Sequence, residues 1–140
     1  MDRQAVNIQD KLMEALLEID VATKRLIEAQ TAYSAFCANE LMLAKEECAL
    51  IENAATLEAY ASSLIDGKNA EQRNVQLAGY LAGHPDAMVA RAELRNAERK
   101  AAQFQAEKAA AELEYKATTY RLHGLRGVAD LQTCLMKGDQ

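Results

Sequence analysis

The stretch from Asn7 to Ile65 contains neither proline nor glycine, and its apolar side chains recur every three or four positions. This spacing is typical of one face of an α-helix and predicts a single helix over residues 7–65. At about 1.5 Å per residue the helix would be roughly 85–90 Å long, so it cannot bury its apolar stripe against itself. The stripe consists of Ile8, Leu12, Leu16, Ile19, Leu26, Ala29, Tyr33, Cys37, Leu41, Ala44, Cys48, Ile51, Ala55 and Ala59.

Residues 66–85 are predicted to form a corner that contains a short helix. Gly67 follows the last periodic residues, where helices commonly end in a left-handed glycine. Asn69 is a good N-cap for a helix over about residues 70–82, and Gln72 stands where it can complete a capping box.

A third helix is predicted over residues 86–122, with Asp86 as its cap. It reaches residue 136 if Gly124 and Gly127 are tolerated within it. Its alanine-rich stripe would let a neighbouring helix approach closely. The stripe is Leu94, Ala97, Ala101, Ala106, Ala109, Leu113, Ala117 and Tyr120, with Val128, Leu131 and Leu135 in the longer form.

The fold class predicted for residues 1–140 is a single all-α domain. We expect a long antiparallel helical hairpin, a coiled coil whose two long helices cover each other beyond the corner. A two-helix seam leaves other apolar side chains uncovered, so we expect hairpins to associate as a homo-oligomeric bundle. The residues expected to stay uncovered within one hairpin include Leu17, Val21, Met42, Leu43, Leu50 and Leu57.

Charge and cysteine content narrow the function classes. Residues 1–65 carry a net charge of −6 and residues 66–140 carry +1. The acidity argues against strong nucleic-acid binding, which depends on neutralising phosphates. Cys37, Cys48 and Cys134 show no metal-site spacing, and their odd number without a signal peptide indicates the cytoplasm. Cys37 and Cys48 share a helix face and are expected in the core. No apolar run is long enough to predict a membrane span.

The corner segment Asp66-Gly67-Lys68-Asn69, with Arg73, is the strongest candidate site. Lys68, Arg73 and the free amides at a helix start could hold an anion or an acidic segment of a partner. The alternative is structural: Asp66 pairs with Arg73 or Lys68, Gly67 ends one helix, and Asn69 begins the next.

A second basic cluster contains Arg121 and Arg126, near Tyr120 and His123. It could line a ligand pocket, or it could reflect only the preference for basic residues near helix ends. The chain has no phosphate loop, nucleophile elbow or metal-binding signature, so we expect neither enzymatic activity nor a cofactor.

The segment YASSLIDGKNAEQRNVQLAGYLAGHPD, followed by an alanine- and glutamate-rich helix, resembles small coiled-coil proteins of tailed bacteriophages. In these proteins a DGKN-x-x-x-R corner joins two long helices, and the motif is matched here by Asp66 to Asn69 and Arg73. The resemblance implies an early phage product, acting in the host bacterial cytoplasm as an accessory in DNA recombination or replication.

The sequence therefore predicts a non-enzymatic, homo-oligomeric interaction protein of a bacteriophage, whose acidic first helix and corner dock on a host or phage protein. The alternative is a counter-defence protein that inhibits a bacterial immune protein or sequesters a nucleotide signal.

Overall fold

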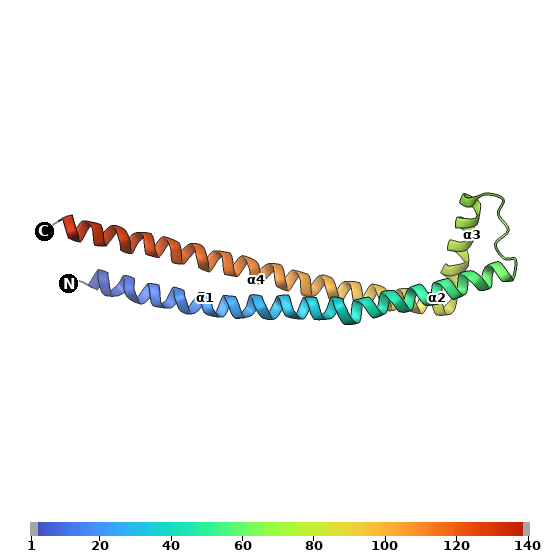
Figure 1. Ribbon diagram of the computed structural model, residues 1–140, viewed down its shortest axis with the longest axis horizontal. Helices are drawn as coiled ribbons and strands as arrows, with labels where there is room; N and C mark the ends of the chain where they lie inside the picture. Colours follow the sequence, from blue (N-terminus) through green and yellow to red (C-terminus); the bar gives the residue numbers. More distant parts are fainter. Residues whose placement is uncertain (1–2, 139–140) are drawn as a thin grey trace. The chain divides into compact units, whose positions relative to one another are not determined.

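The computed structural model describes residues 3–138, with side chains from Asn7 onward. These residues form α1 (Arg3–Phe36), a π-helical turn η1 (Cys37–Leu41), α2 (Met42–Ala61), α3 (Ala70–Gly83) and α4 (Pro85–Gly138). Figure 1 labels the four α-helices. Within the described range every regular element is a helix, which confirms the all-α prediction. Residues 1–2 and 139–140, the ends of the predicted domain, lie outside this range.

The chain divides into two compact units where the sequence predicts one domain. Unit 1 combines residues 1–32 with 104–140, and unit 2 comprises residues 33–103. Long helices α1 and α4 each contribute to both units. Among the described residues, no helix has the combination of length and apolar character that crossing a bilayer requires.

In unit 1 the first part of α1 packs on the last part of α4. Small and large apolar side chains form the contact, with Ala15, Ala22 and Ala111 buried together with Leu122. Two ion pairs flank them: Glu18 with Arg121, and Arg25 with Glu114. Residue numbers therefore rise along one segment as they fall along the other.

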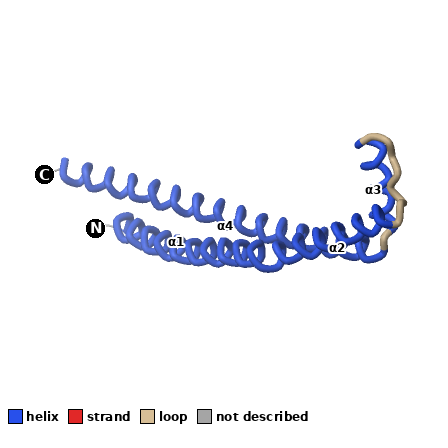
Figure 2. Tube along the Cα trace, turned by 45° about the vertical axis from the view of Figure 1, so that its right-hand side comes forward, coloured by secondary structure: helices blue, strands red, loops and turns tan. Residues whose placement is uncertain are grey.

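In unit 2 the short helix α3 lies across the end of α2 rather than along it (Figures 1 and 2). Ala55, Leu81 and Ala87 form the buried centre, one residue from each of α2, α3 and α4. The half-buried side chains of Ile51, Leu77 and Tyr80 pack around it. This small cluster fixes where the chain turns from α2 to α4.

The predicted helix over residues 7–65 ends four residues too late, because α2 stops at Ala61. Ser63, not Gly67, takes the left-handed conformation, with φ 56°, and no described glycine has a positive φ. The Leu64 N–H donates to the Ala59 carbonyl and the Ser63 N–H to that of Tyr60. These two bonds form the Schellman motif that commonly ends helices, here with serine in the usual glycine position.

The same helix is interrupted by η1, which the sequence did not predict. Up to Phe36 one row of half-buried and buried positions follows alternate steps of three and four, and from Leu41 to Ala55 such a row is present again. The step from Phe36 to Leu41 is five residues, so the π turn absorbs one extra residue. Without it, Glu40 and Leu43 would face inward in place of Leu41 and Ala44.

The third helix, predicted over residues 86–122, extends from Pro85 to Gly138. Gly124 and Gly127 are therefore tolerated within it. Its cap is His84 rather than Asp86. The His84 Nδ1 accepts a hydrogen bond from the Ala87 N–H at 3.3 Å. Pro85 takes the first helical position, where its missing N–H costs nothing.

The inward stripe predicted for the second half of this helix is wrong. Beyond Ala101 the prediction steps five residues to Ala106, and that step moves the stripe to another face of the helix. The inward positions continue instead at steps of three and four, with one step of seven after Ala111, through Phe104, Lys108, Ala111, Thr118, Leu122, Leu125, Ala129 and Gln132. The mispredicted residues, Ala106, Ala109, Leu113, Ala117, Tyr120, Val128, Leu131 and Leu135, are exposed.

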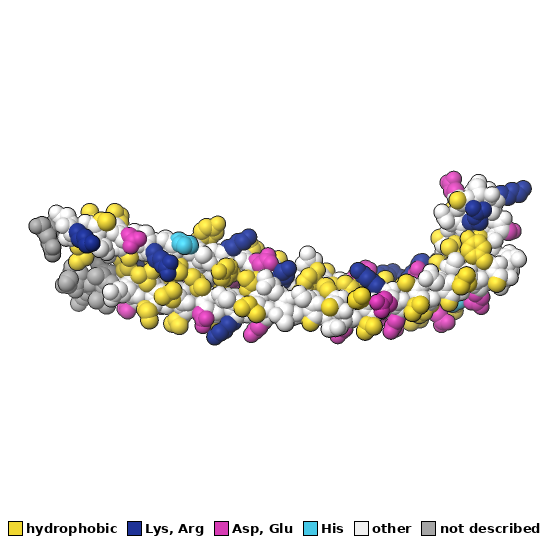
Figure 3. All heavy atoms as spheres, viewed as in Figure 1, with side chains coloured by type: hydrophobic (Ala, Val, Ile, Leu, Met, Phe, Trp, Pro, Cys, Tyr) yellow, Lys and Arg dark blue, Asp and Glu magenta, His cyan; other side chains and the backbone are white. Residues whose placement is uncertain are grey.

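The expectation that apolar side chains stay uncovered within one chain is confirmed. Figure 3 shows hydrophobic side chains on the surface over α1, α2 and α4. Leu16, predicted in the inward stripe, is also exposed, because Ala15 takes the buried position beside it. The residues expected to be uncovered, Leu17, Val21, Met42, Leu43, Leu50 and Leu57, are all exposed.

Candidate functional site

The corner between α2 and α3 is held by one glutamine that the sequence prediction missed. The Gln76 Oε1 accepts hydrogen bonds from the backbone N–H groups of Asp66 and Gly67, at 3.0 and 2.9 Å. Its Nε2 donates to the Asp66 carboxylate at 2.8 Å. Gln76 stands one turn after Gln72 on α3, so both side chains can reach back to the loop. The spacing of four residues between Gln72 and Gln76 was the sequence signal that could have identified Gln76.

Of the two hydrogen bonds in the capping box predicted at Asn69, the first is present. The Asn69 Oδ1 accepts a hydrogen bond from the Gln72 N–H at 2.8 Å, which confirms the N-cap. The Gln72 side chain then accepts from the Lys68 N–H at 2.9 Å instead of from that of Asn69. The capping box is thus displaced by one residue, and the Gln72 amide at the start of α3 is occupied by the protein's own Asn69 side chain.

Arg73 and Gly67 approach each other closely. The Arg73 Nη1 donates to the Gly67 carbonyl at 3.4 Å, and the Arg73 side chain is half-buried. A Cβ added at Gly67 would lie 2.8 Å from both the Arg73 backbone nitrogen and the Gln72 Cβ. Glycine is needed here because the loop touches the start of α3, and not because of a left-handed backbone.

An open concavity of about 710 Å³ lies against this corner. Its charged lining is Asp66, Lys68 and Glu71, that is, two carboxylates and one ammonium group. The net negative charge of this lining favours binding of a basic group on a partner over binding of an anion. The structure therefore brings Asp66, Lys68, Asn69 and Arg73 together, but it turns Arg73 toward the loop.

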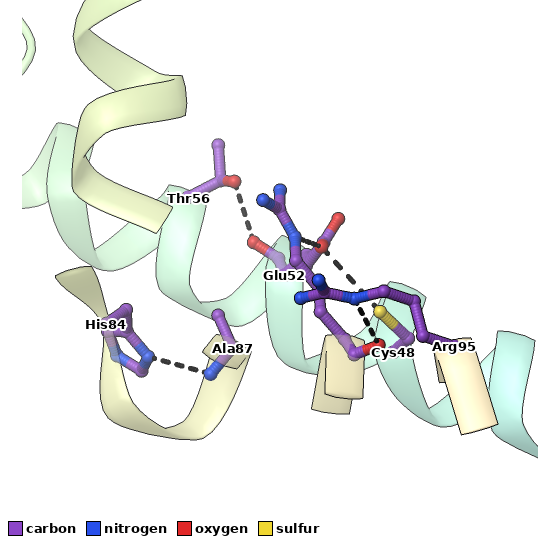
Figure 4. Close-up of polar contacts among 7 residues, drawn as sticks. Cys48, Glu52, Thr56, His84, Ala87 and Arg95 are labelled. Carbon is purple, nitrogen blue, oxygen red and sulfur yellow. Dashed lines mark hydrogen bonds and ion pairs between the residues drawn. The ribbon is translucent and has the colours of Figure 1, made fainter. Parts of the chain in front are cut away.

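A second polar cluster lies between α2 and α4 in unit 2, part of which Figure 4 shows. Glu52 forms an ion pair with Arg91, and the Cys48 thiol donates to the same carboxylate at 3.6 Å. Burial, followed by the nearby Glu52 charge, raises the pKa of Cys48. Further along, the His84 Nε2 lies 3.7 Å from the Glu58 carboxylate. Cys48 is buried as predicted, whereas Cys37 is half-buried.

Arg121 and Arg126 belong to unit 1, so the structure does not unite them with the corner in one unit. The Arg121 Nη1 donates to both carboxylate oxygens of Glu18, at 2.9 and 2.7 Å. Arg126 is exposed one and a half turns further along α4. The two side chains leave the helix in different directions because five residues correspond to about 140° of rotation.

The residues of the described chain contain no cluster of three or more His, Cys, Asp or Glu side chains suited to a metal ion. Comparison with protein-family models, curated proteins and solved structures gives no match.

Proposed function

We propose that this chain is a non-enzymatic, homo-oligomeric interaction protein, built on an antiparallel coiled-coil hairpin. The reversed order of the ion pairs Glu18–Arg121 and Arg25–Glu114 supports the hairpin, as does the three-and-four spacing of the inward positions. The extra exposed apolar positions then serve association with other chains.

One observation carries the docking role. Leu43, Leu50 and Leu57 recur every seventh residue on α2, at 56%, 70% and 71% exposure. Three exposed leucines at this spacing form a row on one face of α2, which marks a surface for a partner helix. Leucine on the outside contributes little to the stability of the single chain.

The charge around this row defines the partner. Apart from Glu52, which pairs with Arg91, helix α2 carries Glu46, Glu47 and Glu58 against the single cation Lys45, a net charge of −2. Carboxylates beside an apolar row favour a partner helix with basic residues at its edges. The corner concavity, with its two carboxylates, also favours a basic partner.

Resemblance of the DGKN-x-x-x-R corner to phage coiled-coil proteins extends the proposal to a phage protein in the bacterial cytoplasm. It would dock on a host or phage protein of DNA recombination or replication. Counter-defence by sequestering a nucleotide is less well supported, because Arg73 is engaged with Gly67 and the corner lining is acidic. Inhibition of an immune protein would use the same α2 row.

The test is affinity capture from phage-infected cells, comparing the wild type with a Leu50→Ala, Leu57→Ala double variant. We expect a recombination or replication protein to be captured by the wild type and lost with the double variant. Leu17→Ala is the matched control, since Leu17 is 65% exposed on α1. Capture that is unchanged in the double variant, or lost equally in the control, would contradict the role of the row.

A further inference from the structure

Helix α4 carries a second apolar row on its outer face, within unit 1. The row follows alternate steps of four and three over four heptads, and every position in it is exposed. Leu113, Tyr120 and Leu131 are its large members, at 67%, 75% and 61% exposure. No member is charged. The full row is Ala106, Ala110, Leu113, Ala117, Tyr120, Gly124, Gly127, Leu131 and Cys134.

Two glycines in this row have no explanation within the single chain. A Cβ added at Gly124 or Gly127 would meet no atom within 4 Å. Glycine inside a helix costs about 0.5–1 kcal/mol relative to alanine, so the folded chain alone would favour alanine at both positions. Close approach of another chain would supply a reason for glycine at these two positions of the row.

We infer that a second copy of this chain covers the row, with its α4 antiparallel and a two-fold axis between Ala117 and Tyr120. This inference deepens the self-association proposed above by assigning its surface. In this register each large side chain faces a small one of the other copy: Leu113 faces Gly124, Tyr120 faces Ala117, and Leu131 faces Ala106. Large side chains that fit opposite small ones give close packing without strain.

Charge complementarity selects the same register. Glu114 and Arg121 lie on the edge of α4 between its inward row and its outer row, and their side chains stay 41% and 48% exposed. The two-fold axis brings Glu114 of each copy beside Arg121 of the other. With Arg25 and Glu18, which already pair with them, the charges then alternate along the edge. The opposite edge brings Lys116 near His123 and gains nothing electrostatically.

Other registers are disfavoured by the same residues. Shifting the second helix by seven residues places either Arg121 against Arg121 or Glu114 against Glu114. A parallel arrangement places Lys116 near Arg121 and sets Tyr120 against Tyr120. Like charges at such positions destabilise helix pairing and set its direction.

Disulfide formation between two proteins that each carry one exposed cysteine tests the arrangement. In both, Cys37 and Cys134 are replaced by alanine, while Cys48 stays because it is buried. One protein then carries Leu113→Cys and the other Gly124→Cys. Under mild oxidation, we expect an equal mixture to form a covalent dimer containing one chain of each kind. Each protein alone is expected to form none, because the two identical cysteines would lie eleven residues apart along the pair.

The matched control mixes Gly124→Cys with Leu17→Cys, which changes an equally exposed leucine on α1. Equal cross-linking in this control would overturn the inference, and so would a dimer from Leu113→Cys alone, which indicates parallel pairing. Absence of the mixed dimer while the wild type sediments as an oligomer would overturn the inference and leave the self-association intact. A monomeric wild type would overturn both.

Discussion

The corner between α2 and α3 and the outer row of α4 achieve specificity in opposite ways. At the corner, polar side chains satisfy the backbone at defined atoms, and Gly67 has space for no further atom. Along the outer row the glycines have open space around them, and the apolar side chains contact solvent. The hydrogen bonds of the corner thus stabilise the fold of the single chain, whereas the repeated exposed apolar side chains of α4 form a surface for another chain.

Single-residue deletions in η1 and in α2 are expected to differ most in their effect on stability. Removing Ala38 from η1 should convert the π turn to α-helix and keep the inward positions on both sides aligned, with little change in stability. Removing Ala49 from α2, which has no π turn, should rotate the following segment by about 100° and cost several kcal/mol. Urea denaturation followed by circular dichroism measures both. Equal loss in the two deletions would show that η1 does not absorb an extra residue.

Leu122 and Leu17 separate the covered face from the exposed one within unit 1. Leu122→Ala should lower the free energy of unfolding by about 3 kcal/mol, because Leu122 is buried at the contact. Leu17→Ala should lower it by less than about 0.5 kcal/mol, as exposed positions do. Thermal and chemical denaturation measure the difference. Similar losses at both positions would contradict the assignment of the faces.

Gly67→Ala and Gly79→Ala test whether the corner has room for one methyl group. The new Cβ at Gly67 would lie 2.8 Å from backbone, so the loop must move, at a cost of about 2 kcal/mol. Gly79 lies inside α3 with nothing within 4 Å of its Cβ, so alanine there should stabilise by about 0.5–1 kcal/mol. Opposite signs in chemical denaturation are the expected result. A gain in stability at both positions would remove the proposed reason for Gly67.

Ser63→Gly probes the left-handed residue that ends α2. Glycine adopts a φ of 56° without the penalty that serine bears, so the variant should be more stable by about 1 kcal/mol. Ser63→Ala keeps the penalty and serves as the control. A gain with alanine as large as that with glycine would show that the backbone conformation is not the cause.

Cys48 gives the smallest effect, a dependence of stability on pH. Burial raises its pKa in the folded protein above the ordinary value of 9.0. The folded state therefore favours the neutral thiol, and this contribution is complete below pH 9 and is lost as the pH rises through the higher folded value. Between pH 8 and 10 the wild type should lose more stability than Cys48→Ala. Parallel pH profiles for the two proteins would contradict the burial of this thiol.

Much of this fold could be predicted from sequence, because helical period and breaker residues act locally. The all-α class, the N-cap at Asn69 and the exposed leucines of α2 followed from them. The choice between two rows on α4 did not, since both repeat at helical spacing and only contact with α1 distinguishes them. The spacing of Gln72 and Gln76 lets both side chains reach back toward the loop, but it does not specify that Gln76 bonds to Asp66, ten residues away.

Sedimentation equilibrium of the wild-type protein at micromolar concentration tests the central claim most directly. Coverage of the outer α4 row by a second copy predicts an even multiple of the 15.4 kDa chain mass, reduced to a single chain by a glutamate at Leu113 and unchanged by one at Leu17. A wild-type mass of 15.4 kDa at the highest concentration reached would contradict the account.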